Sequence, residues 1–287
     1  MPKHEIGPHC EPTWNRQGIL GGSSGSKPLV LAASSEALRR ARYGRMTMER
    51  TMENTEIAAR FRNLTTPHVA DACLRRGVEV RCAPWNLRPL SPSSCWLAGR
   101  VQPARHYGSI DIFLDALEHA SPGDVLIVDN GGRQDEACVG DLIALETKTA
   151  GLAGIVIWGL HRDTPELLEI GLPVFSLGAL PTGPLRLDER EADALVSACV
   201  GPWPVSAHDV ALGDEHGVLF VPVARAEEIA AAARSIRETE RAQAEKMRLG
   251  TSLRAQLEFP DFVSRRSSNP GLTFRQHLRR VGGAVEE

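Results

Sequence analysis

The chain has 287 residues, of which 42% are hydrophobic and 24% are charged, and its formal net charge is −3. This composition is typical of a globular protein and excludes a chain that is disordered throughout, a collagen and a disulfide-dependent miniprotein. The sequence contains no apolar run long enough to cross a bilayer and no apolar signal core, so we expect a cytoplasmic protein with no membrane partner.

The charge is distributed unevenly along the chain. Residues 1–45 carry a net charge of +4 and residues 261–287 carry +2, so residues 46–260 carry −9. An acidic body repels a phosphate backbone, which argues against nucleic acid as a partner. The six cysteines include no C-x-x-C pair and no histidine lies at zinc-finger spacing, so we expect small, buried side chains and no zinc site.

Composition divides the chain into three parts. Residues 1–47 are rich in Gly, Ser and Pro, and we expect a flexible or oligomer-contacting arm. Residues 48–258 form the predicted core domain, which includes a long alanine-rich helix over residues 226–249. Residues 259–287 are predicted to be a polar C-terminal extension.

The first predicted helix of the core is marked at both ends. Thr66 as N-cap and Pro67 at the first helical position predict a helix over residues 67–76, and Gly77 is its stop. The apolar spacing predicts its buried face: Val69, Cys73 and Leu74.

A strand is predicted next, over residues 95–105, and Ser109 is expected to cap a second helix. The i, i+3, i+4, i+7 spacing predicts the buried face of that helix: Ile110, Phe113, Leu114 and Leu117.

Strands and helices then alternate. Strands are predicted at residues 125–128, 155–158 and 174–177, with helices between them at 140–150 and 164–170. This order is typical of an α/β core with crossover connections and parallel strands. Further β structure is expected to close the sheet, in three segments: residues 195–200, 205–212 and 218–221.

Two of these strand ends are candidate binding sites, because ligands in open α/β sheets collect beyond the carboxyl ends of strands. The loops after Val128 and Trp158 are rich in glycine or polar residues. The first loop leads into a helix start, whose unpaired N–H groups and positive dipole can bind a carboxylate or phosphate. The residues of that turn are Gly140, Asp141, Leu142 and Ile143. The ordinary alternative is that the glycine serves only packing and the aspartate only the helix dipole.

Arg162 and Asp163 directly follow the second strand. Because neighbours in an extended chain face opposite ways, we expect the two side chains to diverge, one holding an anion and the other a cation. The local residues by themselves favour a simpler interpretation, with Asp163 or Thr164 as a helix cap and Arg162 in an ion pair. His161 is interpreted as a hydrogen-bonded neighbour and not as a catalyst.

A family resemblance bears on this choice. It is carried by residues 123–184, which read GDVLIVDNGGRQDEACVGDLIALETKTAGLAGIVIWGLHRDTPELLEIGLPVFSLGALPTGP. This stretch resembles the RraA-like family, which includes the 4-hydroxy-4-methyl-2-oxoglutarate (4-carboxy-4-hydroxy-2-oxoadipate) aldolases. Shorter matches are TPHVADACLRRG at residues 66–77 and GDEHGVLFVP at residues 213–222.

The resemblance implies an α/β fold of the swivelling β/β/α type, similar to phosphohistidine domains, in a homotrimer or a dimer of trimers. It also implies roles for six residues: Gly140, Asp141, Leu142 and Ile143 bind substrate, Arg162 binds substrate and acts in catalysis, and Asp163 is catalytic and binds the metal. The implied enzyme is a class II aldolase, a lyase that cleaves a 4-hydroxy-2-oxo acid to pyruvate and a second oxo acid. One carboxylate suits a hard cation such as Mg²⁺ or Mn²⁺, and oxaloacetate decarboxylation would use the same site.

Other residues and other functions offer alternatives to this interpretation. Lys148 lies two helical turns from the site and is interpreted as an ordinary helix lysine instead of a Schiff-base former. Asp129, Asp135 and Glu136 could reach a metal through water, although solvated loop acids are the favoured interpretation. The alternative function is a non-enzymatic regulator that binds a ribonuclease. A methyltransferase is less favoured, because the sequence does not show the Gly-rich nucleotide loop expected of one.

Overall fold

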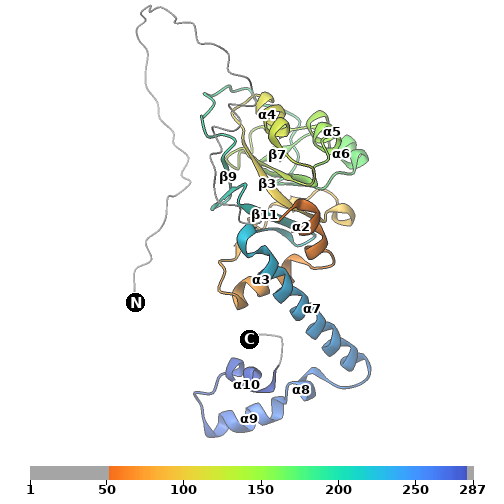
Figure 1. Ribbon diagram of the computed structural model, residues 1–287, viewed down its shortest axis with the longest axis vertical. Helices are drawn as coiled ribbons and strands as arrows, with labels where there is room; N and C mark the ends of the chain where they lie inside the picture. The colour runs from red at the N-terminus through yellow and green to blue at the C-terminus, as the bar shows by residue number, and fades with distance from the viewer. Residues whose placement is uncertain (1–51, 283–287) are drawn as a thin grey trace, which may run out of the picture. The chain divides into compact units, whose positions relative to one another are not determined.

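The computed structural model describes residues 52–282, so the predicted arm over residues 1–47 lies outside the described residues (Figure 1). The helices are α2 (Asn54–Phe61), α3 (Thr66–Arg75), α4 (Asp111–His119), α5 (Asp141–Thr149), α6 (Thr164–Ile170), α7 (Ala226–Arg248), α8 (Leu253–Gln256), α9 (Phe259–Ser268) and α10 (Phe274–Val281). The strands are β1 (Arg81–Cys82), β2 (Arg88–Pro89), β3 (Leu97–Arg105), β4 (Val125–Asp129), β5 (Ala137–Val139), β6 (Gly154–Trp158), β7 (Leu160–His161), β8 (Val174–Ser176), β9 (Ser197–Val200), β10 (Trp203–Ser206), β11 (Asp209–Asp214) and β12 (Gly217–Pro222).

Within the described residues, eight strands form one mixed, curled sheet in the order β1-β12-β11-β3-β4-β6-β8-β2. Strands β3, β4, β6 and β8 run parallel, as predicted, and their connections pass through α4, α5 and α6. The outer strands pair antiparallel. The α/β fold class predicted from the sequence is therefore confirmed.

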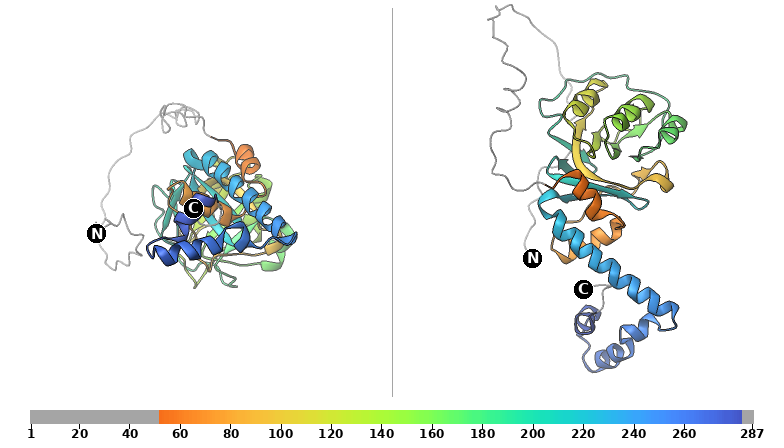
Figure 2. Two further views of the ribbon diagram at one scale, coloured as in Figure 1. Left: turned by 90° about the horizontal axis from the view of Figure 1, so that it is seen from below. Right: turned by 45° about the vertical axis from the view of Figure 1, so that its right-hand side comes forward.

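The core lies on both faces of this sheet. Alternate residues of β4 face opposite sides, so Leu126 and Val128 pack under α4, α5 and α6 while Val125 and Ile127 face β9 to β12. Helices α4, α5 and α6 cover one face of the parallel strands (Figure 1). Helices α2, α3 and α7 pack on the antiparallel strands β11 and β12 (Figure 2). Strand β4 is a central strand of the sheet and is covered on both faces, so its sequence is a continuous apolar run.

The predicted helix limits hold best where proline and glycine mark both ends. Helix α6 has the predicted bounds, with Pro165 in its first turn and Gly171 in a left-handed conformation (φ 67°) at its end. Helix α3 starts one position earlier than predicted, because Thr65 and not Thr66 is the N-cap and forms a capping box with His68.

Two predicted buried faces are partly wrong. Leu74 of α3 is 68% exposed. In α4, Ile110 and Leu114 are exposed, and the side chains that reach the sheet are those of Ile112, Phe113 and Ala116. Because α4 is apolar around most of its circumference, two different stripes fit helical spacing and periodicity could not choose between them.

The predicted strand over residues 205–212 is in fact two strands. Strand β10 pairs with β9 in a separate two-stranded sheet, and β11 enters the main sheet. The break falls at the turn formed by Ala207 and His208. Only the second half of this segment therefore closes the main sheet as expected.

The cysteines are buried at Cys73, Cys95 and Cys138, as predicted, but Cys82 is exposed. Its strand, β1, has only β12 as a neighbour and lies at the edge of the sheet.

Residues 253–281 contain three short helices that follow α7, so much of the predicted polar extension is helical. The proposed domain boundaries remain predictions. Among residues 52–282, no helix combines the length and apolar character that a bilayer crossing requires.

Close packing between β3 and the turn before β4 gives a stability prediction. A Cβ at Gly99 would lie 1.9 Å from the carbonyl oxygen of Gly123, and this backbone atom cannot move aside cheaply. Gly99→Ala should lower the free energy of unfolding by about 1–3 kcal/mol in urea titrations. Gly271→Ala is the control, because its added Cβ would meet only Asn269 at an ordinary 3.6 Å. Equal stability of the two variants would contradict this packing.

Candidate functional site

The two loops singled out in the sequence meet in the structure. Strand β5 lies in the first loop and β7 in the second, and they pair parallel as a small separate sheet. The backbone N–H of Arg162 donates to the carbonyl of Val139 at 2.9 Å. This hydrogen bond places Arg162 and Asp163 beside Gly140 at the start of α5.

Asp163 has an unusual backbone for a residue other than glycine. It lies in the left-handed region (φ 61°, ψ 43°) at the N-cap position of α6, yet its side chain makes no capping hydrogen bond. Its Oδ2 instead lies 3.4 Å from the backbone nitrogen of Asp141, a long hydrogen bond, and 3.4 Å from Nε of Arg162. Asp163 is therefore the N-cap residue of α6, as the simpler interpretation allowed, but its carboxylate does not cap the helix.

The predicted divergence of Arg162 and Asp163 is also wrong. Divergence requires an extended backbone, whereas the left-handed turn at Asp163 brings its carboxylate back toward the guanidinium. Both side chains remain open to solvent, with exposed fractions of 51% for Arg162 and 35% for Asp163. The pair is an exposed, adjacent cation and anion.

Gly140 lies directly against this charged pair. A Cβ there would lie 2.3 Å from Oδ2 of Asp163 and 3.1 Å from Nε of Arg162. The packing role of Gly140 is thus also its role in the candidate site, because the absence of a side chain leaves room for the charged pair.

The other residues of the helix start contribute differently. The carboxylate of Asp141 accepts from the N–H of Leu142 at 2.8 Å, so protein carboxylates already engage the amides of residues 141 and 142. Ile143 is buried in the core and can offer only its backbone, whereas the Leu142 side chain is 74% exposed. An anionic ligand at this turn would compete with Asp141 and Asp163 for the amides.

His161 is a hydrogen-bonded neighbour of the pair, as the sequence suggested, and it is buried. Its Nδ1 lies 2.7 Å from Oγ of Ser176 and its Nε2 lies 3.0 Å from Oγ1 of Thr164. Burial lowers the pKa of its imidazole. Both ring nitrogens are engaged, so His161 holds β7 and α6 in place.

Lys148 points away from the site, as expected, and its Nζ donates to the carbonyl of Ile170 at the end of α6. Asp135 is exposed, and its hydrogen bond from Arg133 lowers the pKa of its carboxyl.

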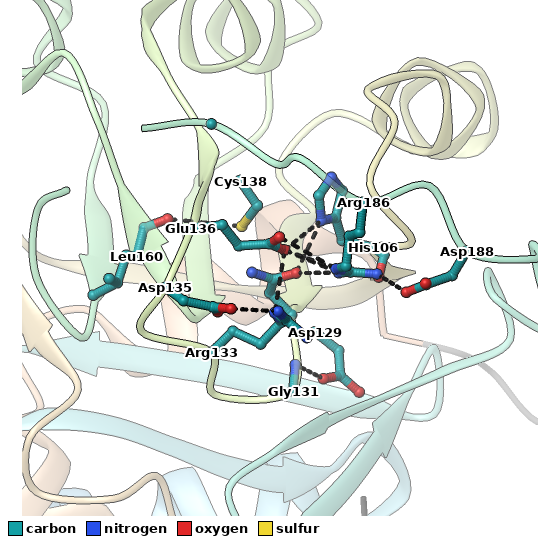
Figure 3. A network of polar contacts seen from close by, with 12 residues as sticks. His106, Asp129, Gly131, Arg133, Asp135, Glu136, Cys138, Leu160, Arg186 and Asp188 are labelled. Carbon is teal, nitrogen blue, oxygen red and sulfur yellow. Dashed lines mark hydrogen bonds and ion pairs between the residues drawn. The ribbon is translucent and has the colours of Figure 1, made fainter. Parts of the chain in front are cut away.

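Asp129 and Glu136 are not solvated loop acids, and that interpretation is wrong for both. The Asp129 carboxylate accepts from the amides of Gly131 and Cys199 at 2.9 and 2.8 Å, and burial raises its pKa. Glu136 is 3% exposed and is paired with Arg186 (Figure 3).

Arg186 was missed in the sequence. It lies 50 positions from Glu136 in a segment without periodicity, so no local signal identifies the pair. A buried glutamate needs a cation, but the sequence favoured Glu136 as a solvated acid, so this requirement could not point to Arg186.

The donor set around Asp163 fits a hard divalent cation held mainly by water and ligand oxygens. No described residue donates a hydrogen bond to Oδ1 of Asp163, so this oxygen is free to bind an ion. Mg²⁺ accepts such sites, because it keeps several waters and uses one or two carboxylates. No cluster of three or more His, Cys, Asp or Glu side chains suited to a metal occurs in residues 52–282.

The charged pair lies on an open surface of the single chain. A cavity of about 570 Å³ lies elsewhere, and residues of the α2–α3 loop, the start of β3 and the β11–β12 turn line it, among them Thr65, Trp96 and Asp214. Neither Arg162 nor Asp163 lines it. We place the candidate site at the charged pair because its exposed guanidinium and carboxylate can bind an anion and a cation.

Known proteins match the central part of this chain. The family model described as RraA-like (Aldolase/RraA) matches residues 66–220. A 4-hydroxy-4-methyl-2-oxoglutarate aldolase of Thermus thermophilus is 34% identical over 125 residues, covering 44% of this chain and 75% of that protein. A relative from Halalkalibacterium halodurans, provisionally named for the same activity, is 30% identical over 116 residues, which cover 40% of this chain. The match spans only 54% of that relative's length.

Solved structures share the fold. An uncharacterized protein from Pseudomonas syringae pv. tomato has a TM-score of 0.61 and 22% identity, covering 69% of this chain and 95% of its own. RraAS2 of Streptomyces coelicolor, described as an unusual member of the RNase ES inhibitor RraA protein family, has a TM-score of 0.57 and 24% identity. It covers 69% of this chain and 100% of its own.

The left-handed backbone at Asp163 can be tested by two substitutions that both remove the carboxylate. Glycine tolerates this backbone whereas the Cβ of alanine is disfavoured in it, so Asp163→Gly should be more stable than Asp163→Ala by about 1 kcal/mol in urea unfolding. In an ordinary helical or extended backbone the order is reversed, and such a result would refute the geometry described above.

Proposed function

This chain belongs to the RraA-like family, and from that membership we propose that it is a lyase that cleaves a 4-hydroxy-2-oxo acid to pyruvate and a second oxo acid. The observation that carries the proposal is the exposed Arg162–Asp163 pair, held beside the start of α5 by a strained aspartate backbone. Strain of this kind is concentrated at functional sites. A protein that only bound a ribonuclease would not need a metal-binding acid, so the exposed Asp163 carboxylate supports the lyase proposal.

The reaction divides into steps that these residues can assist. The bond between C3 and C4 of the substrate breaks, its electron pair moves into pyruvate enolate, and the C4 hydroxyl loses its proton as it becomes a carbonyl. Protonation of the enolate at C3 then gives pyruvate. Negative charge develops on the enolate oxygen, so a preorganised cation at that oxygen lowers the barrier.

Arg162 is the residue that we assign to this charge. Its guanidinium is half exposed and can donate two parallel hydrogen bonds to a carboxylate or an enolate oxygen. Asp163 would hold a divalent cation, Mg²⁺ or Mn²⁺, which when bound supplies Lewis-acid polarisation of the 2-oxo group in a class II mechanism. The amides of Gly140, Asp141, Leu142 and Ile143 would bind the second carboxylate of the substrate. Oxaloacetate decarboxylation also passes through pyruvate enolate, and we propose it as a side activity.

We further propose that the chain assembles as a homotrimer or a dimer of trimers. The site is an open surface in one chain, and apolar side chains beside it are exposed: Leu142 and Leu145 on α5 and Leu168 on α6. A second copy on this face would bury them and close the site against water. Exposed apolar clusters near a site are typical of interaction surfaces.

Pyruvate release from 4-hydroxy-2-oxo acids, measured with lactate dehydrogenase, tests the activity. Arg162→Ala should reduce kcat/KM by a hundredfold or more, about 3 kcal/mol of lost enolate stabilisation, and Asp163→Ala or EDTA should abolish turnover. Glu169→Gln is the control, because it removes an exposed carboxylate from the same helix, α6, and should change kcat/KM less than twofold. Equal turnover by wild type and Asp163→Ala would remove Asp163 from the mechanism. Inhibition of a ribonuclease by an inactive wild type would favour the regulator.

Sedimentation velocity tests the assembly. Leu145→Glu places a charge in the exposed apolar face of α5 and should shift the protein from trimer to monomer. Leu249→Glu is a matched control at a leucine that is also exposed, after the end of α7. An unchanged trimer in Leu145→Glu would show that another surface holds the subunits together.

A further inference from the structure

Figure 3 shows a buried polar cluster around Arg186 and Glu136. It joins the end of β3, the loop between β4 and β5, and the segment that connects β8 to β9, residues 177–196. Its four members are His106, Asn130, Glu136 and Arg186. None of them enters the mechanism proposed above.

Arg186 is the centre of this cluster. Its Nε donates to the two carboxylate oxygens of Glu136 at 3.0 and 3.3 Å, and its Nη2 donates to Oδ1 of Asn130 at 2.9 Å. Its Nη1 pairs with Asp188, and Nη2 also lies 3.3 Å from the carbonyl oxygen of His106. One guanidinium therefore ties the β8–β9 segment to two other parts of the chain.

His106 completes the cluster, and its contact with Asn130 fixes which ring nitrogen donates. Because arginine can only donate, the Asn130 atom that faces Arg186 must be the oxygen, and this oxygen also faces Nδ1 of His106 at 2.9 Å. Nδ1 of His106 is therefore a donor. The ring stacks on Phe113, with centroids 5.2 Å apart, and burial lowers the pKa of its imidazole.

Both sides of the cluster continue into the candidate site. Ala137, next to Glu136, donates to the carbonyl of Thr182 in the β8–β9 segment at 2.9 Å. Two residues on, the carbonyl of Val139 accepts from Arg162. On the other side, a Cβ at Gly183 would lie 3.3 Å from Nη1 of Arg162, so this segment borders the guanidinium.

We propose that Arg186 is a positioning residue for Arg162. By holding the β8–β9 segment against the β4–β5 loop, it fixes the end of β5 and the wall beside the Arg162 guanidinium. This assignment rests on the proposed lyase function for its effect on catalysis, but its structural part does not.

The ordinary alternative is that Arg186 only balances the charge of Glu136, whose side chain is 4% exposed. Two variants separate these roles. Arg186→Met leaves a buried carboxylate without this cation, and Glu136→Gln/Arg186→Met removes the carboxylate charge as well. Arg190→Met is the matched control, because Arg190 lies in the same segment but pairs with Asp111 and Asp115 on the surface of α4.

Thermal unfolding and pyruvate release are measured on all three variants. Arg186→Met should lower the melting temperature, and the double variant should recover most of that loss. The value of kcat/KM should stay at least tenfold below wild type in both, while Arg190→Met stays within twofold. Recovery of both melting temperature and kcat/KM in the double variant would overturn the proposal, because charge balance alone would then explain Arg186.

Amide hydrogen exchange provides a readout that does not depend on the activity. The amides of Ala137 and Arg162 should exchange at least tenfold faster in the double variant than in wild type or Arg190→Met, with the α7 amides unchanged. Wild-type exchange at Ala137 and Arg162 in the double variant would refute the positioning role. If wild type releases no pyruvate, the lyase proposal fails, and exchange still decides the role of Arg186.

Discussion

The left-handed backbone of Asp163 determines where the charges at the ends of β5 and β7 lie. With an extended backbone, the carboxylate would face away from Arg162. The left-handed turn brings it to 3.4 Å from the guanidinium and directly over Gly140, where any side chain would collide with it. The glycine, the aspartate and the arginine are therefore one geometric unit, although 22 positions separate Gly140 from Arg162 in the sequence.

Buried hydrogen bonds and ion pairs support this unit. The β5–β7 pairing sets its register, His161 joins β7 to α6, and the Arg186 cluster joins the β8–β9 segment to the loop before β5. An exposed ion pair by itself contributes little to stability. The buried supports must therefore position Arg162 and Asp163. The contact between these two side chains can be replaced by contacts with a ligand.

Much of the fold could be predicted from the sequence because its signals are local. Pro165 and Gly171 mark the ends of α6, and the apolar runs of β4 and β6 are typical of strands covered on both faces. The candidate site could be located because both loops follow such strands. The conformation of Asp163 could not be predicted, since aspartate tolerates a left-handed backbone better than most residues but does not specify it. The Glu136–Arg186 pair was also beyond reach, because it joins residues 50 positions apart without periodicity.

We propose that Asp163, alone among the protein carboxylates, would hold a divalent cation at this surface. Electron paramagnetic resonance of Mn²⁺ titrated into the protein tests it most directly, because free and bound Mn²⁺ give different signals. We expect one tightly bound Mn²⁺ per chain in wild type, with affinity raised by oxalate, and loss of that site in Asp163→Asn. Equal Mn²⁺ binding by wild type and Asp163→Asn would contradict it.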